Sequence, residues 1–186
     1  MSRTGPSPAV TGSGEARGYG PAAAYCPRCG NRLAGPPPTR CGRCAYQLFH
    51  NARPATNVIV LDATGTRFLA IRRARPPRAG WWETPGGFCD GAEHPAAAAV
   101  RECREELGAE VELGELVGLY PGEYEFQDEV LTVLECFYLA TLVGGQLRPD
   151  AAEASATAWF PLDAPPPLAF ATMDAAVRDV AASLRR

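Results

Sequence analysis

Lysine is absent from the 186 residues of this chain, and all eighteen basic residues are arginine. Without a lysine amine the chain cannot form a Schiff base with a carbonyl substrate. It also cannot build the type of phosphate-binding loop in which a lysine follows a glycine. Composition alone therefore excludes two classes of enzyme mechanism.

Histidine is almost as scarce, because only His50 and His94 are present. The sequence therefore offers few candidate residues for a nucleophilic triad that depends on histidine. His94 directly precedes a predicted helix, where we interpret it as a capping residue and not as a base. His50 borders the linker into the main domain, and we interpret it as structural.

Long apolar runs are also missing. No eighteen consecutive residues are apolar, so the sequence predicts no transmembrane helix, and no secretory signal is visible. The net charge of -3 gives no general attraction to nucleic acid or to an anionic membrane. We therefore expect a cytoplasmic protein. The length and the 46% hydrophobic content suit one packed core and one small additional module.

Acidic residues are plentiful, and they concentrate between Gly86 and Ala109. Pro95 suits the first turn of a helix, Gly108 suits its end, and the alanines between them favour helix. On that helix Glu102, Glu105 and Glu106 stand at positions i, i+3 and i+4, so they share one face. A different face carries Val100, Cys103 and Leu107 and can pack against a sheet.

The acidic face of this helix predicts a site for a divalent cation. Its three carboxylates repel one another, and bound Mg²⁺ or Mn²⁺ would relieve that repulsion. Arg101 can pair with Glu93 or with one of the metal ligands and so fix its geometry. The alternative is an ordinary solvated helix face, which is the usual meaning of a single glutamate. The whole constellation after a Pro-Gly-Gly turn favours the metal site.

A second constellation lies upstream, where two Cys-x-x-Cys pairs are separated by eleven residues. Four thiolates at this spacing suit tetrahedral Zn²⁺, and a site with four cysteines has no open position, which indicates a structural metal. Gly30 and Gly42 are expected to allow the tight turns. Two disulfides are the alternative, but three further cysteines would remain unpaired. The predicted zinc ligands are Cys26, Cys29, Cys41 and Cys44.

Arginines accompany these cysteines, and no acidic residue lies between Cys26 and Cys44. Such a basic segment could indicate nucleic-acid binding. However, Zn²⁺ with four thiolates carries a net charge of minus two, which the arginines partly neutralise. The flanking aromatic residues do not alternate with the arginines as a stacking platform would. We interpret the segment as structural support and nucleic acid as an unlikely partner.

The order of these features predicts three parts: a disordered tail over 1–20, a zinc ribbon over 21–50 and a main domain over 51–186. In the main domain, apolar patterning predicts a mixed sheet between helices, an α/β/α sandwich with the acidic helix on one face. The predicted strands cover residues 56–61, 67–72, 111–120, 130–142 and 156–160, and a C-terminal helix covers residues 171–184.

The spacing of glycines and charges from Gly86 to Ala109 is that of the Nudix box. A four-cysteine zinc ribbon followed directly by this box resembles NADH pyrophosphatases and ADP-ribose pyrophosphatases of the Nudix hydrolase family. The resemblance covers about Tyr25 to Ala182. It implies the Nudix fold, and it implies hydrolysis of a nucleoside diphosphate linked to another group X, with ADP-ribose, NADH or FAD as expected substrates.

The resemblance also implies roles for individual residues. Glu102 and Glu106 correspond to the principal metal ligands, and Glu105 to a further ligand or to the base that activates water. The backbone carbonyl of Gly86 is a further implied metal contact. Glu153, just before the last predicted strand, is the candidate for a ligand or base from a C-terminal loop. The implied catalytic set is Glu105, Glu106, Glu102, Arg101 and Glu93.

Four residues outside the box are candidates for substrate binding. Arg72 and Arg73 begin a basic segment that could face a diphosphate, or could be a solvated loop. Tyr124 and Phe126 belong to an acidic, aromatic segment over 123–126, which is predicted to connect two strands. They could stack on a ring of the substrate, or could pack within the fold.

Two other functions remain open from the sequence. One is a ligand-sensing regulator with a Nudix fold, whose zinc ribbon contacts nucleic acid or a protein partner. The other is hydrolysis of capped RNA. The complete acidic set favours an enzyme that acts on a small dinucleotide or nucleotide-sugar. A homodimer is compatible with the resemblance, while the identity of X cannot be read from the sequence.

Overall fold

A computed structural model describes residues 24–127 and 129–185. The chain divides into two compact units, Met1–His50 and Asn51–Arg186, which are described separately below. The tail predicted to be disordered, residues 1–20, lies outside the described residues.

The first unit contains a short hairpin and two similar turns. Strand β1 (Thr39–Arg40) pairs antiparallel with β2 (Gln47–Leu48). In the first turn the N–H of Gly30 donates to the Cys26 carbonyl, and in the second the N–H of Ala45 donates to the Cys41 carbonyl, both at 2.9 Å. Gly30 and Ala45 have φ values of 69° and 59°. The second turn therefore has its positive φ at Ala45. Gly42 has no positive φ, so the expectation that glycine at this position allows the turn was wrong.

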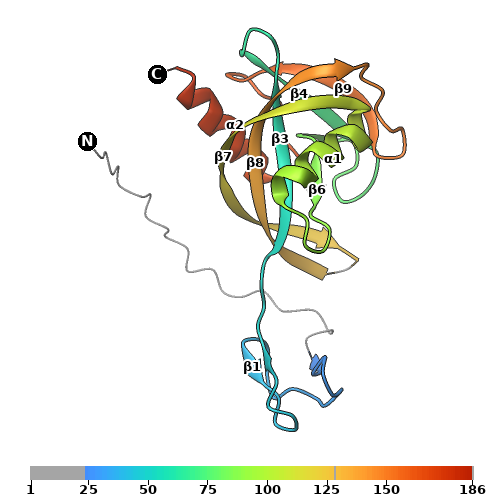
Figure 1. The fold of residues 1–186 in the computed structure, drawn as a ribbon, viewed down its shortest axis with the longest axis vertical. Coiled ribbons are helices and arrows are strands. Elements are labelled where there is room, and N and C mark those ends of the chain that lie inside the picture. Colours follow the sequence, from blue (N-terminus) through green and yellow to red (C-terminus); the bar gives the residue numbers. More distant parts are fainter. Residues whose placement is uncertain (1–23, 128, 186) are drawn as a thin grey trace, which may run out of the picture. The chain divides into compact units, whose positions relative to one another are not determined.

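The second unit is built on a seven-stranded mixed sheet (Figure 1). Its main path runs β5-β4-β3-β8-β7, with β6 paired to β3 and β9 paired to β4. The β3–β8 pairing is parallel, and the other pairings are antiparallel. The strands are β3 (Arg53–Leu61), β4 (Arg67–Arg73), β5 (Trp82–Glu83), β6 (Gly86–Phe88), β7 (Ala109–Phe126), β8 (Glu129–Gly145) and β9 (Ala154–Pro161).

Within the described residues the sheet is accompanied by helices α1 (Pro95–Leu107) and α2 (Ala171–Ser183). His94 is the N-cap of α1, and its Nδ1 accepts a hydrogen bond from the Ala96 N–H at 3.1 Å. The helix ends at Gly108, which has a left-handed φ of 63°. The capping role predicted for His94 is therefore confirmed.

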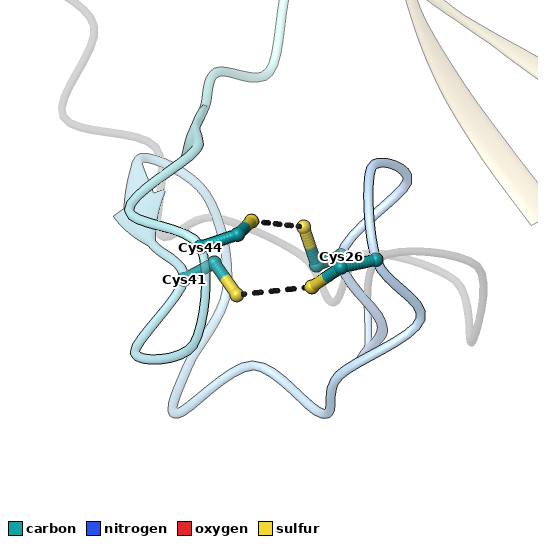
Figure 2. A group of neighbouring side chains, drawn as sticks. Cys26, Cys41 and Cys44 are labelled. Atoms are coloured by element: carbon teal, nitrogen blue, oxygen red, sulfur yellow. Dashed lines mark hydrogen bonds between the residues drawn. The ribbon is translucent and has the colours of Figure 1, made fainter.

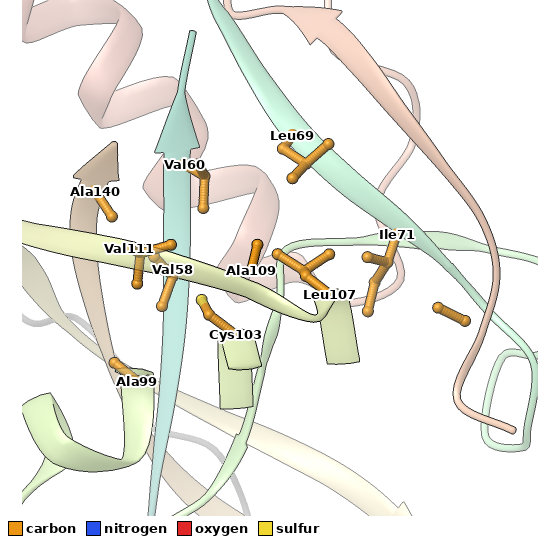
Figure 3. Packing of buried hydrophobic residues seen from close by; sticks show 11 residues of the cluster. Val58, Val60, Leu69, Ile71, Ala99, Cys103, Leu107, Ala109, Val111 and Ala140 are labelled. Atoms are coloured by element: carbon orange, nitrogen blue, oxygen red, sulfur yellow. The ribbon is translucent and has the colours of Figure 1, made fainter. Parts of the chain in front are cut away.

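Alternating side chains of the central strands enter two cores on opposite faces of the sheet. Val58 and Leu69 pack on the α1 side with Cys103 and Leu107 (Figure 3). The neighbouring strand residues Ile59, Phe68 and Ala70 pack on the other side of the sheet. They contact apolar side chains of α2: Met173, Ala176, Val177 and Val180. Because α1 covers one face of the sheet and α2 covers the other, the predicted α/β/α sandwich is confirmed.

The largest difference from the predicted elements lies in the β7–β8 hairpin. Residues 123–126 are not a connection but the last part of β7, since the ladder continues through Tyr124 opposite Leu131 to Phe126 opposite Glu129. Within this segment Tyr124 is less exposed than Glu123 and Glu125 on either side of it, as in a strand with one solvated face. Strands β5 and β6 were not predicted, because they are too short for a periodic signal.

No helix among the described residues is both long enough and apolar enough to cross a bilayer.

Candidate active site

Strand β6 places two glycines directly against helix α1. Gly86 donates its N–H to Oε2 of Glu106 at 2.9 Å. A Cβ on Gly86 would lie 2.1 Å from the Thr56 carbonyl oxygen, and a Cβ on Gly87 would lie 2.5 Å from Oε1 of Glu102. Gly86 also has a φ of 153°, which side-chain-bearing residues rarely adopt. Glycine at position 86 is therefore required by its φ and by its close approach to β3, whereas a side chain at position 87 would displace the Glu102 carboxylate.

Arg101 joins the acidic residues of the box into one network. Its Nε and one terminal nitrogen donate to both oxygens of Glu93, at 3.0 and 2.9 Å. The other nitrogen donates to Glu102 at 2.8 Å and to Glu105 at 2.9 Å. A fifth bond, of 3.1 Å, reaches the Phe88 carbonyl. These five bonds match the five N–H donors of a guanidinium, so the predicted pairing of Arg101 is observed.

Two glutamates of α1 are strongly withdrawn from solvent. Glu106 is 6% exposed, and burial, with a contribution from nearby Glu83, raises its pKa well above the usual value. Burial also raises the pKa of Glu102, although Arg101 opposes that shift. Glu105 is different, because its side chain is 55% exposed. The acidic face therefore has one buried carboxylate (Glu106), one half-buried carboxylate (Glu102) and one solvated carboxylate (Glu105).

Glu83 is an acidic residue that the sequence analysis missed. It is 6% exposed on β5 and pairs with Arg73. Burial raises the pKa of Glu83 to about 7, against the lowering influence of Arg73. The available signal was an acid directly after two tryptophans, because an ionisable residue beside such apolar side chains is seldom fully buried without a partner.

Glu83, Glu102 and Glu106 belong to one cleft, whose lining does not include Glu93, Arg101 or Glu105. The cleft is lined by Arg73, Arg75, Pro76, Glu83, Gly86, Gly87, Glu102, Glu106, Tyr124, Phe126 and Glu153. Glu153 thus shares the cleft with Glu102 and Glu106, and it lies 3.5 Å from an Arg75 nitrogen. Of the predicted substrate-binding residues, Arg73, Tyr124 and Phe126 line the cleft. The Arg72 side chain is instead bonded to the Gly80 carbonyl at 2.9 Å.

A smaller pocket adjoins this cleft and shares Arg73, Glu83, Gly86, Gly87 and Tyr124 with it. Its aromatic lining consists of Phe88, Tyr124 and Phe170. The ring centroids of Phe88 and Tyr124 are 5.4 Å apart, and those of Tyr124 and Phe170 are 5.5 Å apart. The site therefore combines an acidic cleft with an aromatic pocket.

The donor chemistry of the cleft fits a hard divalent cation. Glu102, Glu106 and Glu153 offer carboxylate oxygens, and mutual repulsion contributes to the raised pKa of Glu106. Among the described residues only the cysteine cluster brings three or more ligand atoms within 4.8 Å of one another. The carboxylates are thus more widely spread than the thiols.

The four cysteines of the first unit converge as the sequence predicts. Sγ of Cys26 lies 3.7 Å from that of Cys44, and Sγ of Cys29 lies 3.6 Å from that of Cys41 (Figure 2). A tetrahedral zinc site with Zn–S bonds near 2.3 Å has sulfur–sulfur edges of about 3.8 Å. All seven cysteines are free, so the disulfide alternative does not apply. The cluster fits a structural Zn²⁺.

Comparison with known proteins agrees with this geometry. Residues 51–180 match the NUDIX domain family. The chain belongs to the Nudix family. The match begins just after the cysteine cluster and includes α1, β6 and the cleft.

Among curated members of the Nudix family, NAD-capped RNA hydrolase NudC of Pseudomonas aeruginosa is 31% identical over 149 residues. The alignment covers 77% of this chain and 50% of that protein, so the chain spans about half the length of this relative. ADP-ribose pyrophosphatase of Methanocaldococcus jannaschii is 32% identical over 127 residues, with 67% and 71% covered.

Solved Nudix structures are similar over most of the chain. A MutT NUDIX hydrolase from Burkholderia pseudomallei superposes with a TM-score of 0.61 at 29% identity, covering 70% of this chain and 99% of that one. A NUDIX hydrolase from Nitrosomonas europaea gives a TM-score of 0.66 at 23% identity, covering 83% and 88%, which shows a shared fold.

Proposed function

We propose that this Nudix protein is a divalent-metal-dependent hydrolase that cleaves the pyrophosphate bond of a nucleoside diphosphate linked to another group. The proposed substrates are small dinucleotides or nucleotide-sugars, with ADP-ribose, NADH and FAD as the leading candidates. The observation that carries the proposal is the cleft in which Glu102, Glu106 and Glu153 meet the backbone of Gly86 and Gly87.

The residues that would hold Mg²⁺ or Mn²⁺ are Glu102, Glu106 and Glu153, with the carbonyl of Gly86 as a backbone ligand. Glu105 stays an alternative ligand or general base. When bound, the cation would neutralise phosphate charge and lower the pKa of a bound water. The four cysteines of the ribbon would hold Zn²⁺, which has a structural role because no coordination position remains open.

The chain's own residues prepare this site before any ligand arrives. The five donors of Arg101 hold Glu102 and Glu105 in fixed rotamers and connect them to the loop at Phe88. Arg73, fixed by Glu83, adds a cation between the acidic cleft and the aromatic pocket. A diphosphate in the cleft would meet this guanidinium, and the linked ring would meet Tyr124 or Phe126.

Hydrolysis of NAD-capped RNA is the second candidate, favoured by the similarity to the Pseudomonas aeruginosa protein of that name. Its pyrophosphate bond is chemically the same as that of free NAD. The ligand-sensing alternative is less well supported, because a sensor does not need a hydrolytic acidic set. The cytoplasmic location and the homodimer remain predictions.

A substrate panel tests the proposal. The purified chain is incubated with Mg²⁺ and ADP-ribose, NADH, FAD, nucleoside triphosphates or NAD-capped RNA, and products are separated by chromatography. We expect two monophosphate products from at least one dinucleotide or nucleotide-sugar, and no product in EDTA. Glu106→Gln should lower kcat/KM at least about 100-fold, because a ligand carboxylate is lost. Turnover that survives both EDTA and Glu106→Gln would contradict the proposal.

The matched control is Glu110→Gln, the same chemical change just beyond the C-terminus of α1. Glu110 is exposed and pairs with Arg104 outside the cleft. We expect its kcat/KM to stay within about twofold of the unmodified chain, because surface ion pairs contribute little.

A further inference from the structure

Arg78 lies in the loop between β4 and β5, and the proposed hydrolysis makes no use of its charge. Among the described residues its side chain has no ion pair and no hydrogen bond. Arg78 is exposed, and its φ of 59° lies in the left-handed region, which residues with a side chain seldom adopt. Such a conformation persists only where the surrounding structure imposes it, and it is most frequent at ligand-binding sites.

The two arginines at the end of β4 hold this loop in place. Nε of Arg72 donates to the Gly80 carbonyl at 2.9 Å, and Nε of Arg73 donates to the Pro77 carbonyl at 2.7 Å. The N–H of Gly80 donates in turn to the Arg73 carbonyl at 2.8 Å. These bonds lie on both sides of Arg78, so its backbone is fixed without help from its own side chain. The loop therefore presents the guanidinium of Arg78 and does not depend on it.

Two aromatic rings orient the guanidinium of Arg78. Its Cζ lies 5.8 Å from the ring centroid of Trp81 and 5.7 Å from that of Phe170. These cation–π contacts fix the planar group but leave its N–H donors available to an oxygen ligand. A guanidinium held in this way suits a phosphate, whose oxygens can accept two parallel hydrogen bonds.

Phe170 connects Arg78 with the proposed substrate site. It lines the aromatic pocket, and Cζ of Arg73 lies 5.4 Å from the centroid of the same ring. Arg73 lines both the pocket and the cleft, and Glu83 compensates its charge. Arg78 has no such partner among the described residues, so it adds an uncompensated positive charge at the pocket. A substrate whose diphosphate occupies the cleft could reach this charge with a further anionic group.

We propose that Arg78, oriented by Trp81 and Phe170, binds a phosphate group of the substrate other than the two of its pyrophosphate. The inference rests on the proposed function and narrows its substrate class, because ADP-ribose, NADH and FAD have no further phosphate. Dinucleotides that carry one are preferred. Two sources share this chemistry: a phosphate monoester on a ribose, and the first phosphodiester of an RNA chain attached to the dinucleotide.

Nucleotides without a pyrophosphate bond test the preference in the absence of turnover. Isothermal titration of the full chain with Mg²⁺ compares AMP with adenosine 2′,5′-bisphosphate, adenosine 3′,5′-bisphosphate and the dinucleotide pApA. The bisphosphates add a monoester and pApA adds a phosphodiester, so the arms distinguish the two sources. We expect at least one of the three to bind about tenfold more tightly than AMP, because charge-assisted hydrogen bonds to phosphate are gained.

A matched pair of variants assigns this difference to Arg78. Arg78→Gln should reduce the difference below about twofold, because the charge and the two parallel donors are lost. Its melting temperature should change only slightly, since Arg72 and Arg73 still hold the loop. The control is Arg178→Gln, the same change at an exposed residue of α2 that lines neither the cleft nor the aromatic pocket. It should leave the difference unchanged.

Three results would overturn the inference. The first is that none of the three nucleotides binds at millimolar concentration, or that all bind within about twofold of AMP. The second is that the difference persists in Arg78→Gln. The third is an equal loss in Arg178→Gln, which would indicate a general effect of charge. Hydrolysis of a free dinucleotide together with one of these results would refute this inference alone. The expected binding difference in a chain that hydrolyses nothing would refute the proposed function alone.

Discussion

The two units of this chain achieve order by different physical means. In the described part of the first unit only Cys26, Pro37 and Cys41 are buried, while Tyr25 and Phe49 are 57% and 61% exposed. The second unit buries apolar side chains on both faces of a sheet. We therefore expect the first unit to depend on metal ligation for its stability, and the larger unit to depend on its apolar cores. The difference predicts distinct responses to chelators and to core substitutions.

Loss of a zinc ligand should have the largest effect, and only on the first unit. Structural Zn²⁺ contributes about 10–16 kcal/mol to folding in small zinc peptides. Cys44→Ser should therefore abolish zinc binding, measured by mass spectrometry of the metal, and collapse the amide NMR dispersion of residues 24–50. Resonances of the second unit should not move. Preserved dispersion in the first unit of the zinc-free variant would show that it does not depend on metal.

Truncation of a core side chain should act on the other unit alone. Leu107 is fully buried between α1 and the sheet. Leu107→Ala should lower the free energy of unfolding of the second unit by about 2–5 kcal/mol, measured by urea denaturation, because a cavity replaces the side chain. Zinc content should be unchanged. Zinc loss in this variant would show that the two units are coupled, contrary to the comparison.

Replacement of Arg101 should weaken catalysis more than it lowers the stability of the fold. Arg101→Lys keeps the charge but cannot reproduce five hydrogen bonds to four groups. Loss of such orienting contacts typically costs about 10–100-fold in metal affinity or activity. We expect a loss of that size in kcat/KM, with part of it recovered at high Mg²⁺ concentration. Activity equal to that of the unmodified chain would show that the carboxylates are positioned without Arg101.

The smallest effect is expected at the surface of the same helix. Arg104 donates two hydrogen bonds to Glu110, at 2.9 and 3.0 Å, and lowers the pKa of that carboxylate. The pair is solvated, so Arg104→Ala should change the melting temperature only slightly at pH 7. A lowered folded-state pKa stabilises above the unfolded pKa and is lost as pH falls through the folded value. The small difference should therefore vanish in strong acid, which melting curves at several pH values would check.

The sequence predicted the parts of this molecule that are encoded locally. The i, i+3, i+4 spacing places glutamates on one helix face, and the Cys-x-x-Cys pairs specify a compact metal cluster, because both depend on near neighbours. Glu83 could not be assigned in this way. It lies on a strand of only two residues, and a strand of that length has no periodicity from which its burial could be predicted. The error at 123–126 has a similar cause, since strand pairing overrode local composition.

The parallel pairing of β3 with β8 sets an order of events during biosynthesis. The bonded residues Thr56 and Cys136 are 80 positions apart, and the whole acidic helix lies between them in the chain. Helix α1 therefore leaves the ribosome before the central strand that completes the sheet beneath it. Non-local pairings of this kind form late. A nascent chain that ends before β8 would carry every residue of the Nudix box and still have no assembled site.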